Sequence, residues 1–115
     1  AFKAALQASD GIIISIAEHN GAYTTAFKNI FDWISRLEKP IWCGKPMFLL
    51  STSTGVRGGK TVLELAHLRL SRDMPNIPCF ALPSYKETFD EEKGIVEATH
   101  LAAFNEALEI FVMQL

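Results

Sequence analysis

Three short apolar runs alternate with longer amphipathic segments, a pattern typical of βα units built on a parallel sheet. Gly11 to Ile16 is a continuous β-branched block, as expected of a strand that is covered on both faces. Pro46 to Thr52 and Ile77 to Leu82 predict the second and third strands. Because Pro78 donates no ladder hydrogen bond, the third strand is expected at a sheet edge or to start at this residue.

Each amphipathic segment predicts a helix that follows a strand. Helical spacing between Thr24 and Leu37 predicts the first helix, with Thr24 or Thr25 as its amino-terminal cap. A second helix is predicted from about Lys60 to Arg72. In a final helix, the acidic residues 90–92 suit the positive amino end, and five apolar residues form one stripe. The stripe consists of Leu101, Phe104, Leu108, Phe111 and Leu115.

These elements predict a single α/β domain over residues 1–115. A three-stranded sheet is small for a doubly wound fold, in which the strand over Gly11 to Ile16 would normally be central and paired on both edges. The chain begins at Ala1 without an initiator methionine, and Ala1 to Ala8 has the pattern of the last turns of a helix. We therefore expect the chain to be a fragment of a larger domain.

Composition and charge narrow the possible partners. The chain is 49% hydrophobic and 21% charged, with a formal net charge of −2, and it has no lysine or arginine cluster. These properties argue against nucleic acid or an acidic membrane surface as the main binding partner, and they favour a small molecule or another protein. No apolar stretch is long enough to span a bilayer, and the start of the chain lacks a signal-peptide pattern, so a cytoplasmic protein is predicted.

The residues that often hold metals are scattered along the sequence. Cys43 and Cys79 are far apart and form no Cys-x-x-Cys motif, so we predict two reduced structural thiols. His67 and His100 have no carboxylate or thiol at ligand spacing. No metal site is predicted.

In an open α/β sheet, ligands bind outside the carboxyl ends of the strands, so the loops that follow the three strands are the candidate sites. The first loop carries Glu18-His19-Asn20-Gly21, and the second is the glycine-bearing and hydroxyl-rich run from Ser51 to Gly59. Taken alone, the first loop is also compatible with an ordinary polar turn, because Asn-Gly is a common turn dipeptide.

The two loops and the helix between them resemble the NADPH-dependent FMN reductase family, relatives of flavodoxin that reduce azo compounds, chromate and quinones. That family carries Pro-Glu-Tyr-Asn after its third strand, then Leu-Lys-Asn and Asp-Trp. The corresponding residues here are Ala17-Glu18-His19-Asn20-Gly21, Phe27-Lys28-Asn29 and Asp32-Trp33. Gly44-Lys45-Pro46 and the loop that closes with Gly58-Gly59 also match in kind and spacing.

The resemblance implies a flavodoxin-like three-layer α/β/α fold with a parallel sheet of order 2-1-3-4-5. The strands present here would be the third, fourth and fifth, with the first two missing. It implies a flavin-dependent oxidoreductase that uses FMN as cofactor and NAD(P)H as co-substrate. The acceptor would be a quinone, an azo compound, a metal oxyanion or free flavin. No side chain need act as a catalytic acid or base, because the cofactor supplies the hydride chemistry. A homodimer or homotetramer is expected.

The resemblance also implies which residues bind the isoalloxazine ring, largely through backbone groups. Small hydroxylated residues and glycines suit this role, because they allow the backbone to approach a flat ring closely. The residues implied are Glu18, His19, Asn20 and Gly21 on one side, and Thr52, Ser53, Thr54, Gly55, Gly58 and Gly59 on the other.

Two departures from the family pattern affect this site. Ala17 replaces the family proline, and His19 replaces the family tyrosine, so we expect His19 to stack or hydrogen-bond in its place. The family's phosphate-binding run, Gly-Ser-x-Arg-x-x-Ser-x-Asn, occurs nowhere in the chain, so the FMN phosphate lacks its usual anchor.

Two alternative functions stay open. The chain is either an enzyme portion or a catalytically silent protein-interaction module of the same fold, which would self-associate through the edge of Gly11 to Ile16 or along the helix carrying Trp33. A more remote alternative is a P-loop-like nucleotide-binding protein, because Gly59-Lys60-Thr61 follows a strand and a glycine-rich turn. Its spacing does not fit, since Thr54 stands where the motif needs glycine.

Overall fold

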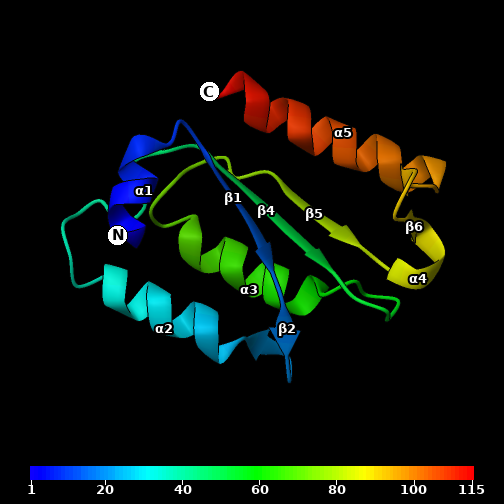
Figure 1. Cartoon of the computed structure of the whole chain (residues 1–115), viewed down its shortest axis with the longest axis horizontal. Coiled ribbons are helices and arrows are strands. Elements are labelled where there is room, and N and C mark those ends of the chain that lie inside the picture. Colours follow the sequence, from blue (N-terminus) through cyan, green and yellow to red (C-terminus); the bar gives the residue numbers. More distant parts are fainter.

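A three-stranded parallel sheet lies between two layers of helices in the computed structural model, which describes all 115 residues (Figure 1). The sheet consists of β1 (Ile12–Ile16), β4 (Met47–Thr52) and β5 (Cys79–Leu82). The helices are α1 (Phe2–Ala8), α2 (Thr25–Ile34), α3 (Lys60–Leu70), α4 (Tyr85–Thr88) and α5 (Ala98–Met113). Two small hairpins are formed by β2 (Glu18–His19) with β3 (Ala22–Tyr23), and by β6 (Phe89–Asp90) with β7 (Gly94–Ile95).

The strand order is β1-β4-β5, and both pairings are parallel. This order agrees with the predicted flavodoxin-like α/β fold. β5 lies at an edge, and it begins directly after Pro78, as the proline predicts. Pro78 uses its carbonyl group, which accepts a hydrogen bond from the Leu49 N–H at 3.0 Å.

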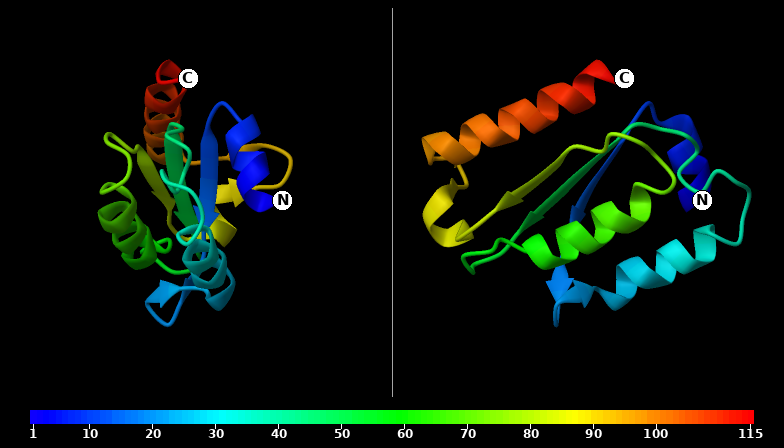
Figure 2. Two further views of the ribbon diagram at one scale, coloured as in Figure 1. Left: turned by 90° about the vertical axis from the view of Figure 1, so that its left-hand side faces the viewer. Right: turned by 180° about the vertical axis from the view of Figure 1, so that it is seen from behind.

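Side chains of the sheet form one core on each face, because successive residues of a strand point in opposite directions. One core contains Ile12, Ile16, Met47 and Leu49, packed against α1, α2 and α3. On the other face, Phe48, Phe80 and Leu82 pack against Ala107 and Phe111 of α5. Figure 2 shows α5 as the one long helix on this second face, with α2 and α3 opposite it.

α5 leaves part of the second face uncovered. Ile13 of β1 points to that face and is 55% exposed, although it lies in the middle of a strand. The outer edge of β1 also has no partner strand. Of the predicted apolar stripe on α5, Phe104, Leu108 and Phe111 pack on the sheet, whereas Leu101 and Leu115 are exposed.

The amino ends of α2 and α5 are each capped by a side chain that precedes the helix. Thr24 caps α2 as predicted, because its side-chain oxygen accepts a hydrogen bond from the Phe27 N–H at 3.1 Å. The predicted role of residues 90–92 at the start of the last helix was wrong. Asp90 instead accepts hydrogen bonds within the β6–β7 turn, and Glu97 caps α5 by accepting from the Thr99 and His100 N–H groups. These two hydrogen bonds lower the pKa of the Glu97 carboxyl.

The two tryptophans lie in different surroundings, Trp33 on α2 and Trp42 in the segment between α2 and β4. Trp42 is 2% exposed and packs against Phe31, with ring centroids 5.7 Å apart. The Lys3 ammonium holds this segment by donating to the carbonyls of residues 38, 40 and 41. Trp33, on the outer face of α2, is 69% exposed.

No helix has both the length and the hydrophobicity that crossing a membrane requires.

Candidate functional site

The first two loops leave the sheet side by side. β1 and β4 are neighbours in parallel register, with Ile16 opposite Ser51 at their carboxyl ends. The residues predicted for the two sides of a flavin ring therefore follow neighbouring strands at the same end of the sheet, although more than thirty residues separate them in the sequence.

The first loop is a β-hairpin. Glu18 pairs with Tyr23 and His19 with Ala22, and the turn between them is Asn20-Gly21. Both turn residues have positive φ, 53° and 77°, as two-residue hairpins of this kind require. All four predicted residues, Glu18 to Gly21, are exposed, and nothing lies within 4 Å of a Cβ added at Gly21.

The hairpin is attached to helix α3 by two polar contacts. The Val62 N–H donates to Oε1 of Glu18 at 2.8 Å, and the Tyr23 hydroxyl donates to the Leu65 carbonyl at 3.4 Å. Burial raises the pKa of Tyr23, and the positive charges of Arg69 and Lys28 oppose that shift. Glu18 therefore directs its carboxylate to the helix, which leaves the backbone of the hairpin for contacts with a ligand.

The second loop is fixed to the end of β5. The Thr52 hydroxyl donates to the Leu82 carbonyl at 2.7 Å, and the buried Ser51 hydroxyl donates to the Gly58 carbonyl at 2.8 Å. These bonds close the loop on itself and on the neighbouring strand. The hydroxyl of Thr52, predicted to face a ring, is therefore already used as a donor within the protein.

The loop after β5, the third of the candidate loops, supports the second loop through two backbone hydrogen bonds. The Ser84 N–H donates to the Gly55 carbonyl at 2.8 Å, and the Tyr85 N–H donates to the Ser53 carbonyl at 2.9 Å. Ser53 is half-buried, and its hydroxyl accepts from the Gly55 N–H, whereas Thr54 and Gly55 are exposed.

The two glycines at the end of the second loop are buried and serve its packing. A Cβ added at Gly58 would lie 2.5 Å from the Leu82 carbonyl oxygen and 2.8 Å from the Pro83 nitrogen, and its φ is 60°. Gly59 is the amino-terminal cap residue of α3. Among the predicted residues, these two shape the loop, while the exposed ones form its outer surface.

The amino end of α3 is not available as a phosphate site. Such an end binds anions through its free N–H groups, but the Glu18 carboxylate already accepts from Val62 there. Arg57, in the preceding loop, donates to the Thr61 hydroxyl at 3.3 Å. The P-loop alternative therefore has no support from the geometry, because this protein supplies its own anion at that position.

Comparison with known proteins identifies the family. The model of the family described as NADPH-dependent FMN reductase matches residues 1–88. The chain belongs to this family. The match confirms the resemblance carried by the first two loops and by the helix between them.

Two relatives of this FMN reductase family member are named for the reduction of quinones and of azo compounds. NADPH:quinone oxidoreductase from Arabidopsis thaliana is 30% identical over 101 residues, which cover 84% of this chain and 51% of that protein. NADPH azoreductase from Bacillus sp. (strain OY1-2) is 32% identical over 69 residues, which cover 60% of this chain and 37% of that protein. The chain spans about half the length of the curated relatives it matches, or less.

A solved structure supports the fold. FerB, a flavoenzyme NAD(P)H:(acceptor) oxidoreductase from Paracoccus denitrificans, superposes with a TM-score of 0.79 at 23% sequence identity. The superposition covers 97% of this chain and 64% of the FerB chain. The architecture of this family member is thus flavodoxin-like along nearly its whole length.

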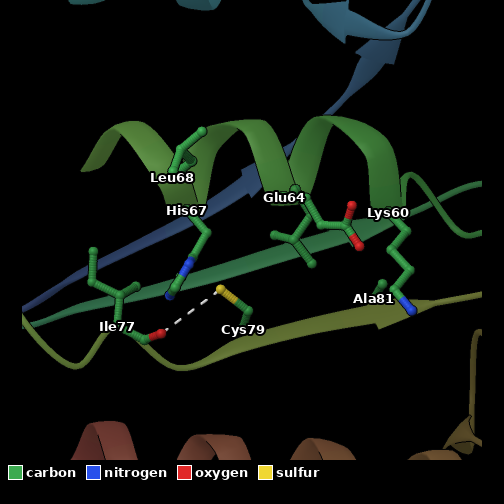
Figure 3. A pocket seen from close by; sticks show the side chains of 8 residues that line it. Lys60, Glu64, His67, Leu68, Ile77, Cys79 and Ala81 are labelled. Carbon is green, nitrogen blue, oxygen red and sulfur yellow. Dashed lines mark hydrogen bonds between the residues drawn. The ribbon is translucent and has the colours of Figure 1, made fainter. Parts of the chain in front are cut away.

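A groove of about 590 Å³ lies between α3 and the open edge of β5 (Figure 3). It is lined by Lys60, Leu63, Glu64, His67, Leu68, Ile77, Cys79 and Ala81. Burial raises the pKa of the Cys79 thiol to about 11, so the thiol is neutral and weakly nucleophilic at neutral pH. No group of three or more histidine, cysteine or acidic side chains is arranged to hold a metal ion.

Proposed function

We propose that the whole protein is an NAD(P)H-dependent FMN reductase that passes hydride equivalents from NAD(P)H through FMN to a small acceptor. The observation that carries the proposal is the pairing of Ile16 with Ser51, which sets Glu18 to Gly21 beside Thr52 to Gly55. The acceptor is proposed to be a quinone or an azo compound, after the names of the relatives. A metal oxyanion or free flavin is a further proposed acceptor, because either can be reduced by the bound flavin in the same way.

The exposed residues of both loops suit a flat ring that carries carbonyl and nitrogen groups at its rim. Asn20 and Gly21 present exposed backbone on one side, and Thr54 and Gly55 do so on the other. His19 projects from the exposed hairpin and would stack on the ring or hydrogen-bond to it. FMN, when bound, supplies the hydride transfer, and these residues supply its placement.

We infer that residues 1–115 are the carboxyl-terminal portion of one flavodoxin-like domain. The unpaired outer edge of β1 and the exposed Ile13 support this inference, because a further strand and a covering helix would bury both. In such a domain the preceding segment would also supply the phosphate-binding loop. The 115-residue chain alone would then bind FMN more weakly than the whole protein.

The whole protein is proposed to form a homodimer or homotetramer. The exposed Trp33 on α2 supports this proposal, because an indole in water is a common anchor of protein interfaces. We expect Trp33→Ala to lower the oligomeric state measured by sedimentation. Unchanged sedimentation would exclude α2 from the interface.

A cytoplasmic location is also proposed. Cys43 and Cys79 are both free thiols, which suits a compartment that keeps cysteines reduced. Cell fractionation of the whole protein is the direct test, and recovery in a secreted fraction would contradict the proposal.

The enzymatic proposal is tested by reconstituting the full-length protein with FMN. We expect retained flavin absorbance after gel filtration, bleaching of that absorbance by NADPH, and its recovery on addition of a quinone. Ping-pong kinetics would follow from the two separate half-reactions. A full-length protein that retains no flavin would favour the catalytically silent interaction module instead.

A further inference from the structure

Helix α3 begins without a capping side chain of its own. Its amino-terminal cap residue is Gly59, so the usual side-chain acceptor for the N–H groups of the first turn is absent. Val62, the third residue of the helix, is fully buried, and a buried N–H without a partner is strongly unfavourable. The partner comes from 44 residues away, where Glu18 Oε1 accepts from the Val62 N–H at 2.8 Å.

The charge of Glu18 suits this position. An α-helix carries partial positive charge at its amino end, and a carboxylate placed there is stabilised. Hydrogen bonds that involve a charged group are also stronger than neutral ones. The carboxylate is therefore both an acceptor and a counter-charge for the eleven-residue helix.

The same contact joins the two loops of the proposed flavin site. Glu18 opens the β2–β3 hairpin, and α3 directly follows the second loop. The other polar link between hairpin and helix, from Tyr23 to Leu65, is longer at 3.4 Å. Glu18 is thus the shortest polar connection between the hairpin and the helix that continues the second loop.

We propose that Glu18 is a positioning residue, whose carboxylate caps α3 and thereby sets the spacing and order of the two loops that would flank the flavin ring. This proposal rests on the proposed function for its consequence in FMN binding. Glu18 itself does not contact the ring in this role. The hairpin and the amino end of α3 behave as one unit because of it.

Three variants separate the possible roles. Glu18→Gln keeps an acceptor oxygen and removes the charge, whereas Glu18→Ala removes both. Glu91→Ala is the matched control, because Glu91 is an exposed acid in the β6–β7 turn with no hydrogen bond or ion pair from its side chain. The conservative Gln variant also guards against loss of folding.

The first measurement uses the chain without flavin. In Glu18→Ala we expect amide hydrogen exchange at Val62 to accelerate about tenfold, as the loss of one charged hydrogen bond implies, with a smaller increase in Glu18→Gln. The ¹⁵N heteronuclear NOE of Asn20 and Gly21 should fall as the hairpin loosens. Unchanged exchange at Val62 would overturn the capping role, and unchanged NOE values would overturn the positioning role.

The second measurement is the FMN dissociation constant of the full-length protein. We expect it to rise about tenfold in Glu18→Ala, to rise less in Glu18→Gln and to stay constant in Glu91→Ala. Faster exchange at Val62 with unchanged FMN affinity would make Glu18 a helix cap only. If the unmutated protein binds no FMN, the proposed function fails, while the exchange and NOE results still decide whether Glu18 joins the loops.

Discussion

The two loops proposed to flank the flavin ring are held in opposite ways. The second loop is tied by backbone and hydroxyl hydrogen bonds to its own residues, to the end of β5 and to the segment after it, and Gly58 and Gly59 are buried there. The first loop is an exposed hairpin attached to α3 by two side chains, Glu18 and Tyr23. The second loop is thus packed against the end of β5, while the position of the first loop depends on two side chains that reach from the hairpin to α3.

This difference implies that the two sides respond differently to mutation. Changes in the second loop disturb packing that the whole domain uses, so they alter global stability. Changes in the hairpin act on a small exposed unit, so they alter local order and ligand binding more than unfolding. Glycine positions with positive φ in both loops allow a direct comparison.

The largest effect is expected from Gly58→Ala. The added methyl group would meet the Leu82 carbonyl, and the positive φ disfavours any residue with a Cβ. We expect a loss of about 3 kcal/mol in the free energy of unfolding, measured by urea denaturation.

Gly21→Ala is the control for this prediction. It shares the positive φ but has free space around the added methyl group, so we expect a loss of about 1 kcal/mol. Equal losses for the two variants would mean that backbone conformation alone, and not the contact with Leu82, makes the second loop sensitive.

A smaller effect is expected from Ser51→Ala. Its buried hydroxyl is a donor to the Gly58 carbonyl, and removing it leaves that carbonyl without this partner. We expect a loss of about 1 to 2 kcal/mol in the free energy of unfolding. Thr54→Ala, in the exposed part of the same loop, should change stability little. A large loss at Thr54 would contradict the division of this loop into a buried base and a free outer surface.

The smallest expected effect is a loss of stability at alkaline pH. Burial raises the pKa of Cys79, beside β4, from 9.0 to about 11, and it also raises the pKa of Tyr23 in the hairpin. The folded state therefore holds both protons more tightly than the unfolded state. Stability is retained below about pH 9 and falls as the pH rises toward 11.

Denaturation series at pH 8 and pH 10.5 measure this fall, and single variants assign it. Cys79→Ala should remove most of the pH dependence between 9 and 11, while Tyr23→Phe should remove the part above pH 10. If Tyr23→Phe removed the larger part, the hairpin would be more firmly packed than the comparison of the two loops implies.

The main elements of the fold follow from sequence patterns, whereas the contacts between loops do not. Continuous apolar strands, the Thr24 cap and the position of Pro78 predict β1, β4, β5 and α2 because each signal is local. The hairpins were not predicted as such, since strands of two residues are too short for any periodicity. Asn20-Gly21 is the one signal that would have indicated the first of them.

The misplaced acidic cap shows how a local signal can indicate the wrong element. Residues 90–92 carry the charges that a helix start favours, but Gly94 allows a tight turn there, and α5 begins only at Ala98. The role of Glu18 was likewise invisible, because its partner lies 44 residues away and is a backbone N–H. The sequence resemblance to the family indicated which two loops form the candidate site. The hydrogen bonds that hold these loops in place could be found only in the structure.

The two tryptophans give the protein a pair of independent optical reporters. Trp42 is enclosed next to Phe31, so its fluorescence follows the integrity of the core beneath β1 and β4. Trp33 stands in water on α2, so its emission reports on whatever covers that helix. A chain with Trp33→Phe would signal unfolding alone, and one with Trp42→Phe would signal association, so the two variants report folding and assembly separately under the same conditions.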